Sequence, residues 1–165
     1  MRPRRIAALV ACALLLGACA AGAGSAEENR PRPSIDFPSS VPAGSVQTAT
    51  LTVTNPGPEA FDSLLVAFSR LGRAPDKPVV PEPIVDTGFK GRNRAVVSVI
   101  PKPVAVSQDG LVYRFGSLGP GRDMEVEFSL RMPQRPGLAA NAVIVSDGSN
   151  LKLSRGVTLE TSVRG

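Results

Sequence analysis

Few residue types in this 165-residue chain could perform covalent or metal chemistry. Histidine is absent, and cysteine occurs only as Cys12 and Cys19. Without histidine the chain has no Ser-His-Asp or Cys-His nucleophile and no imidazole ligand for a metal ion. Two cysteines are too few for a zinc ribbon or an iron–sulfur cluster. The composition therefore argues against an enzyme, and the sequence predicts neither a cofactor nor a metal site.

The most regular set of ionisable side chains is a row of carboxylates on one expected strand. Asp123, Glu125 and Glu127 alternate with apolar residues, so they share one strand face at intervals of about 7 Å. With Asp109 or Asp147 they could bind Ca²⁺ or supply the two carboxylates of a glycosidase. Solvent-facing strands normally bear such charges, which discourage edge-to-edge aggregation. We interpret the row as a solvated face, and an accessory module for Ca²⁺ or cell-wall carbohydrate stays as the alternative function.

The cysteine whose surroundings predict a reaction is Cys19. Three arginines in the first five residues precede an apolar run, Ile6–Ala18, which is too short to span a bilayer permanently and is typical of a signal peptide. The run ends in Leu16-Gly17-Ala18-Cys19, which resembles the bacterial lipobox. The resemblance implies that residues 1–18 are a lipoprotein signal peptide, cleaved between Ala18 and Cys19, and that Cys19 receives a diacylglyceryl group.

Two other processing routes are open. Leu9-Val10-Ala11-Cys12 also has lipobox form, but cleavage there would leave a very short apolar run, so we interpret Cys12 as part of the signal helix. Alternatively, an ordinary signal peptidase could cleave after Ala23 or Ala26 and release a secreted protein. We predict lipidation at Cys19, because two acyl chains are about what stable anchoring requires. The expected location is the cell envelope, membrane-anchored and facing outside the cytoplasm.

The basic character of the chain depends largely on this N-terminal region. The formal charge is +5, and removal of the three arginines leaves 16 basic and 14 acidic residues, a formal +2. The remaining basic residues are scattered and lack interleaved aromatic residues, which argues against a nucleic-acid partner. Residues 19–33 are small, polar and interrupted by proline, and this composition predicts a flexible tether.

From Ser34 onward, apolar residues recur with a period of two, as in half-buried strands. Gln47–Asn55 and Asp123–Leu130 alternate most clearly, and Pro103–Ser107 either continues the strand before it or forms a short edge strand. The other expected strands are Leu64–Ser69, Arg94–Ile100, Leu111–Phe115, Leu138–Ser146 and Val157–Val163. About seven short strands without a periodic helix predict an all-β fold, an immunoglobulin-like antiparallel β-sandwich over residues 34–165.

Three stretches resemble a bacterial cell-surface family. Leu51–Pro58 is similar to the opening strand and turn of the "conserved repeat domain", an immunoglobulin-like module of unknown function akin to the CARDB adhesion-type domains. Tyr113–Gly121 resembles that family's second signature, and Asn141–Val143 resembles its closing strand. The resemblance implies a sandwich from about Val41 to Val163 and implies little about function.

The segment Leu71–Asn93 departs from that family's pattern. It contains four prolines, which cannot donate ladder hydrogen bonds, so we expect an extended surface loop. Long loops are often functional, and this one offers a partner cationic and aromatic contacts. The candidate partner-binding residues are Arg73, Lys77, Phe89, Lys90 and Arg92. The alternative is a tolerated insertion in which Ile84, Val85 and Phe89 pack on the sandwich.

Two remaining features have structural interpretations. Gly116–Gly121 is rich in glycine but precedes a strand rather than a helix, so we do not expect a phosphate-binding loop. Tyr113, the only tyrosine, is expected in the core or at a corner of the sandwich rather than as a catalytic acid. The sequence thus predicts a non-catalytic, envelope-anchored lipoprotein. Its β-sandwich would contact an unknown envelope protein or serve as a structural element of the cell surface.

Overall fold

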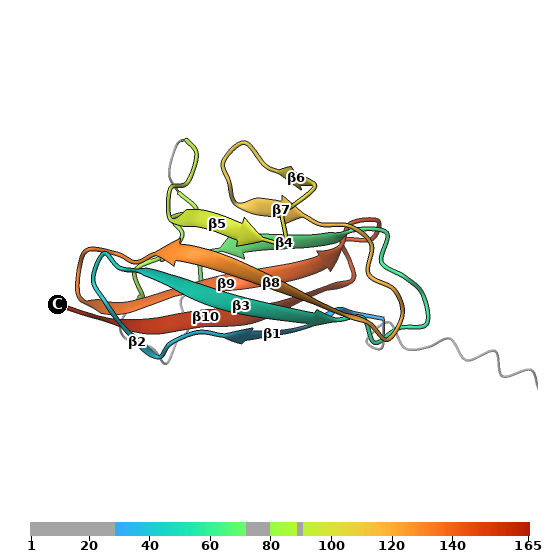
Figure 1. The fold of residues 1–165 in the computed structure, drawn as a ribbon, viewed down its shortest axis with the longest axis horizontal. Coiled ribbons are helices and arrows are strands. Elements are labelled where there is room, and N and C mark those ends of the chain that lie inside the picture. Colours follow the sequence, from blue (N-terminus) through green and yellow to red (C-terminus); the bar gives the residue numbers. More distant parts are fainter. Residues whose placement is uncertain (1–28, 72–79, 89–90) are drawn as a thin grey trace, which may run out of the picture.

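The computed structural model describes residues 29–71, 80–88 and 91–165. In this part of the chain there are ten strands (Figure 1). They are β1 (Arg32–Asp36), β2 (Ser40–Pro42), β3 (Val46–Thr54), β4 (Leu64–Ser69), β5 (Val96–Ile100), β6 (Ala105–Val106), β7 (Val112–Arg114), β8 (Asp123–Arg131), β9 (Gly137–Asp147) and β10 (Ser154–Arg164). No helix in the described ranges has the length and apolar character needed to cross a membrane. The expected signal peptide, with Ala18 and Cys19, lies outside these ranges.

The strands form two sheets that pack face to face. One sheet has the order β1-β3-β8-β5, and the other has the order β2-β10-β9-β4-β7-β6. Neighbouring strands are antiparallel except β2 and β10, which are parallel. The prediction of an all-β, immunoglobulin-like sandwich is confirmed. The described strands number ten rather than about seven, and the β2–β10 pair makes the pairing not wholly antiparallel.

The two strands that the sequence did not predict come from the start of the domain. β1 pairs with β3, and β2 pairs with the end of β10. Because β1 and β2 follow each other in the chain but belong to different sheets, this segment closes one side of the sandwich. β1 begins at Arg32, two residues before the expected domain boundary, so the last residues of the expected tether form a strand. Pro33 is tolerated there because β1 is an edge strand.

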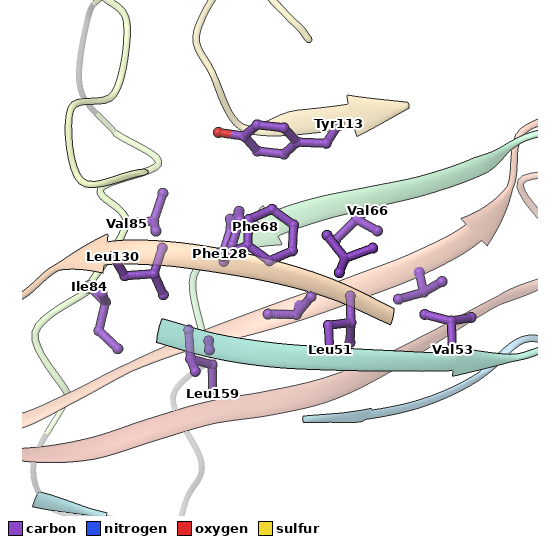
Figure 2. Packing of buried hydrophobic residues seen from close by; sticks show 14 of the residues in the cluster. Leu51, Val53, Val66, Phe68, Ile84, Val85, Tyr113, Phe128, Leu130 and Leu159 are labelled. Carbon is purple, nitrogen blue, oxygen red and sulfur yellow. The ribbon is translucent and has the colours of Figure 1, made fainter. Parts of the chain in front are cut away.

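The core lies between the two sheets and follows the predicted alternation. In β3, Ala49, Leu51 and Val53 are at most 1% exposed, and the intervening threonines face outward. The side chains of Phe68, Tyr113 and Phe128 pack edge to face, with ring centroids 5.2–6.2 Å apart (Figure 2). Such aromatic pairs add about 0.5–1.5 kcal/mol each beyond the burial of their area.

The chain turn after β3 is fixed by the fully buried Asn55. Its Nδ2 atom donates hydrogen bonds to the carbonyl oxygens of Glu59 (2.7 Å) and Leu118 (2.9 Å), and its Oδ1 atom accepts one from the N–H of Gly57 (3.0 Å). Its carbonyl oxygen accepts a further hydrogen bond from the N–H of Gly121, a residue with φ 63°. The glycine-rich segment before β8 therefore forms a turn held against the end of β3.

Candidate binding site at the open edge of the sandwich

The side of the sandwich opposite β1 and β2 is less completely covered. Here the four-stranded sheet ends in β5 and the six-stranded sheet ends in β6. Residues 101–104 cross from one sheet to the other, and β6 lies on the far side of β7 from β4 (Figure 1). No further strand of the described residues pairs with the outer edge of β5. We call this side the open edge.

A hollow of about 180 Å³ lies at the open edge, and we call it the edge hollow. Its lining includes Val96 and Val99 of β5, Val106 of β6 and Tyr113 of β7. Val99 pairs with the buried Phe128 and Val106 pairs with Tyr113, so these valines face the interior of the sandwich. Val96 and Val99 are nonetheless only partly buried, and Val106 is 38% exposed. The core is therefore accessible from this side.

Large exposed apolar side chains concentrate around the same edge. Of the seven such residues in the described part of the chain, four lie between positions 97 and 106. Val97 (51% exposed) occupies an irregularity where β5 shifts register against β8, and Ile100 (62%) and Val104 (67%) follow. Single exposed apolar residues are normal on protein surfaces, whereas a contiguous group indicates an interaction site. Two of these residues, Val97 and Val106, line the edge hollow together, which favours a binding role for the open edge.

Basic side chains flank β5 on both sides. Arg92 lines the edge hollow, Arg94 is exposed just before β5, and Lys102 is exposed just after it. The strand itself, Val96–Ile100, contains no charged residue. An uncharged edge strand is a template for pairing with another chain, and flanking charges determine which chains can approach.

Two acidic residues, Asp109 and Glu127, lie near the open edge but outside the edge hollow. The Asp109 carboxylate accepts hydrogen bonds from Ser107 Oγ and from the N–H of Leu111, and these bonds hold its pKa below the usual value. Glu127 pairs with Ile100 and lies on the outward face of the four-stranded sheet. Neither residue lines the edge hollow.

The candidate residues of the segment Leu71–Asn93 are only partly placed. Arg73, Lys77, Phe89 and Lys90 lie outside the described residues, whereas Arg92 is exposed and lines the edge hollow. A partner-binding role for this segment stays a prediction. Arg92 connects it to the open edge.

Residues 80–88, the longest described stretch of that segment, belong partly to the core. Ile84 is 4% exposed and Val85 is fully buried. The fully buried Asn141 of β9 binds both backbone groups of Val85: Oδ1 accepts from the N–H (2.8 Å), and Nδ2 donates to the C=O (2.9 Å). Nδ2 also donates to the carbonyl oxygen of Ser69 (3.1 Å). The prediction that Ile84 and Val85 pack on the sandwich is confirmed, and the prediction of a surface loop is wrong for these two residues.

Hydrogen bonds of Asp86 and Asn93 hold the described residues that precede β5. The Asp86 carboxylate accepts hydrogen bonds from the N–H of Gly88 (2.9 Å) and from Arg70 (3.1 Å), and these bonds hold its pKa below the usual value. Asn93 donates from Nδ2 to the carbonyl oxygen of Asp86 and accepts at Oδ1 from the N–H of Ala95. A second hollow of about 310 Å³ lies between these residues and Arg92. The start of β5 is therefore held in place, and Arg92 lines both hollows.

The row of carboxylates on β8 is solvent-exposed. Asp123, Glu125 and Glu127 lie opposite threonines of β3 on the outward face of the four-stranded sheet. Asp147 is buried at the end of β9, where its carboxylate accepts hydrogen bonds from the N–H and Oγ of Ser149. Within the described residues there is no group of three or more His, Cys, Asp or Glu side chains placed to hold a metal ion. The interpretation of the row as a solvated face is confirmed.

Tyr113 lies in the core, as expected. Its side chain is 5% exposed and stands beside Phe68 and Phe128 (Figure 2), and its hydroxyl donates a hydrogen bond of 2.7 Å to the carbonyl oxygen of Gly110. Burial raises the pKa of the phenol to about 12. The tyrosine is therefore neutral at physiological pH and forms the inner wall of the edge hollow.

The fold and its open edge define a β-sandwich domain of the immunoglobulin-like class. No family model and no curated protein matches the sequence. One similar solved structure is the CARDB domain of a Pyrococcus furiosus protein in complex with di-metal ions, at 16% identity, 84% coverage of this chain, 90% of that chain and a TM-score of 0.46.

Two further solved structures are similar at comparable levels. BslA, described as a bacterial hydrophobin, is 10% identical over 81% of this chain and 99% of that chain, with a TM-score of 0.49. The PKD domain of an M14-like peptidase from a Thermoplasmatales archaeon is 13% identical over 83% of this chain and 99% of that chain, with a TM-score of 0.41.

The edge hollow was not predicted from the sequence. Val96, Val99 and Val106 look like ordinary strand residues, and nothing local indicates that their two strands end different sheets beside each other. The available signal was the uncharged run Val96–Ile100, with Arg94 before it and Lys102 after it. Edge strands usually include an inward charge or a proline, and this strand has neither.

Proposed function

We propose that the protein is an envelope-anchored lipoprotein whose β-sandwich acts through protein–protein contact at the cell surface and has no catalytic role. The observation that favours this function is the open edge, where an uncharged strand, an accessible hollow with several valines in its wall and flanking cations occur together. Binding through such an edge uses backbone groups and apolar side chains and needs no reactive residue.

The N-terminal sequence provides the anchor in this proposal. A diacylglyceryl group on Cys19 would hold the chain at the membrane. Twelve residues separate Cys19 from the start of β1 at Arg32, and an extended segment of that length reaches about 40 Å. The sandwich would therefore stand clear of the lipid headgroups, with its edges accessible to other envelope proteins.

Labelling of growing cells with a fatty-acid probe tests the anchor. We expect the protein to incorporate the probe and to fractionate with membranes, and we expect Cys19→Ala to abolish the label. Cys12→Ala is the matched control and should leave labelling unchanged, because Cys12 lies within the segment that is removed. Label that persists in Cys19→Ala, or a wild-type protein without label, contradicts the lipoprotein assignment.

Cross-linking in intact envelopes tests the interaction role. We expect a discrete adduct of this chain with one other envelope protein, obtained reproducibly at low cross-linker concentration. A chain that stays monomeric under these conditions contradicts a function in protein–protein contact.

A further inference from the structure

We propose that the open edge binds an extended, apolar segment of another protein that has acidic residues at both ends. The segment adds as a strand to the outer edge of β5 and inserts an aliphatic side chain into the edge hollow. This inference rests on the proposed interaction function and names the chemical class of the partner.

The backbone of β5 supplies the first part of the site. β5 is the last strand of the four-stranded sheet, so the backbone groups that point away from β8 lack a strand partner among the described residues. An incoming extended segment can pair with those groups, as in other cases of strand addition. The turn at Asp86 and Asn93 fixes the start of β5, so this edge is ordered before a partner arrives.

The edge hollow supplies the second part of the site. Successive side chains of a strand point to opposite faces, so every second residue of an added strand would face the interior of the sandwich. There it would meet the partly buried Val96 and Val99 and the exposed side of Val106. The valines, Pro103 and the ring of Tyr113 in the wall of this hollow of about 180 Å³ can pack against an aliphatic side chain, while Arg92 and Ser98 add polar atoms to the same wall. Burial of that side chain would complete the apolar core at this edge.

The positive charges around β5 favour acidic residues at both ends of the partner segment. Arg92 and Arg94 precede the strand and Lys102 follows it, so both ends of the binding edge are positive. Acidic residues before and after an apolar segment would lie close to these cations. Opposite charges at the rim of an interface increase the rate of association and discriminate against partners of the wrong charge.

The same charges argue against a second copy of this chain as the partner. If β5 paired antiparallel with its own copy around Ser98, Val96 would face Ile100, and Arg94 would face Lys102 at both ends. Like charges directly opposite each other in a sheet are destabilising. The positive flanks therefore disfavour self-association, whereas they favour an acid-ended segment.

A synthetic peptide provides a direct test. The probe is a fluorescently labelled peptide of alternating valine and threonine with two aspartates at each end, titrated into the mature protein in detergent and followed by anisotropy. We expect saturable binding that weakens as salt concentration rises. A peptide of the same core with lysines at the ends should bind at least about tenfold more weakly. A version with proline at its centre, which cannot continue the ladder, should also bind poorly.

Two sets of variants assign the binding to this edge. Val106→Gln should weaken binding at least about fivefold, corresponding to about 1 kcal/mol, whereas Leu151→Gln, at a 64% exposed residue outside the open edge, should not. The double variant Arg94→Glu and Lys102→Glu should reverse the preference and bind the lysine-ended peptide. Arg135→Glu with Arg164→Glu is the charge-matched control and should keep the preference for acidic ends. Thermal unfolding of each variant verifies that it is folded.

Several results would overturn the assignment. These are no peptide binding up to about 1 mM, equal affinity for the aspartate-ended and lysine-ended peptides, or an equal loss of affinity in Val106→Gln and Leu151→Gln.

Other outcomes would assign the edge to a different occupant. Binding to anionic lipid vesicles without binding to the peptide would assign the edge to a membrane. A dimer in sedimentation that Val106→Gln dissociates would assign it to a second copy. An envelope cross-link that persists in the Arg94→Glu and Lys102→Glu variant would overturn this site and leave the proposed function standing.

Discussion

At the residue scale, the fold depends on a few buried polar side chains that form hydrogen bonds with backbone groups outside the strand ladders. Asn141 is the clearest case, since its fully buried amide satisfies the N–H and C=O of Val85 and the C=O of Ser69. Asn55 has the same role at the other end of the sandwich. Each joins segments far apart in the sequence, which explains why both are fully buried despite their polarity.

We predict that Asn141→Ala lowers the free energy of unfolding by about 2–4 kcal/mol, because it leaves the buried N–H of Val85 and two carbonyl groups without partners. Urea denaturation followed by circular dichroism measures the change. Asn150→Ala is the matched control: this exposed asparagine makes one solvent-accessible bond to the N–H of Lys152, so its loss should cost less than about 1 kcal/mol. Equal effects of the two substitutions would contradict the bridging role of Asn141.

We predict that the protein loses stability in strongly alkaline solution through Tyr113. Burial raises its pKa in the folded state from 10.0 to about 12. The neutral phenol therefore contributes fully below about pH 10, and the free energy of unfolding falls by about 2 kcal/mol as the pH rises toward 12. Because Tyr113 is the only tyrosine and tryptophan is absent, phenolate absorbance reports its titration directly.

Tyr113→Phe separates this effect from other alkaline titrations. The variant should lose about 1 kcal/mol at neutral pH, since the hydrogen bond to Gly110 is absent, and its stability should change less between pH 10 and 12. An identical pH dependence in wild type and Tyr113→Phe would contradict the assignment.

At the scale of elements, the segment Leu71–Asn93 combines a core anchor with a surface approach to β5. We predict that Ile84→Ala lowers the free energy of unfolding by about 2–4 kcal/mol, because Ile84 is 4% exposed and belongs to the core cluster. Val80→Ala, at a 62% exposed position of the same segment, should change it by less than about 0.5 kcal/mol. A small effect at Ile84 would show that the segment is separate from the core.

Sequence alternation was sufficient to predict some elements and insufficient for others. β3, β4 and β8 each bury one face, so their apolar residues recur at every second position and their ends were predicted to within a residue or so. β1 and β2 are short edge strands that contain proline, and their pairing with β3 and β10 is set by contacts distant in the sequence. Local patterns contain no information on such contacts.

The candidate site was less predictable than the fold. Arg92 was singled out from its segment, but the valines of the edge hollow follow the ordinary strand pattern. Their exposure arises because β5 and β6 end two different sheets at the same side. That arrangement is a property of strand order, and strand order depends on the tertiary fold rather than on any local motif.

At the scale of the whole molecule, the two sides of the sandwich are unequal. β1 and β2 close one side with strands from the start of the domain, whereas the opposite side ends in β5 and β6 with an accessible hollow between them. A partner strand paired with β5 would cover the second side, as β1 and β2 cover the first. The start of β1 and the proposed binding edge therefore lie on different sides of the molecule.

The pairing of β1 with β3 also determines how the domain bears load. A pull on the residues before Arg32 that is directed along β1 acts at right angles to the ladder bonds between β1 and β3. Such a force shears the whole β1–β3 ladder at once instead of opening its bonds one after another. If the proposed anchor and partner are both engaged, a load along β1 would therefore be resisted by all five residue pairs of the β1–β3 ladder together.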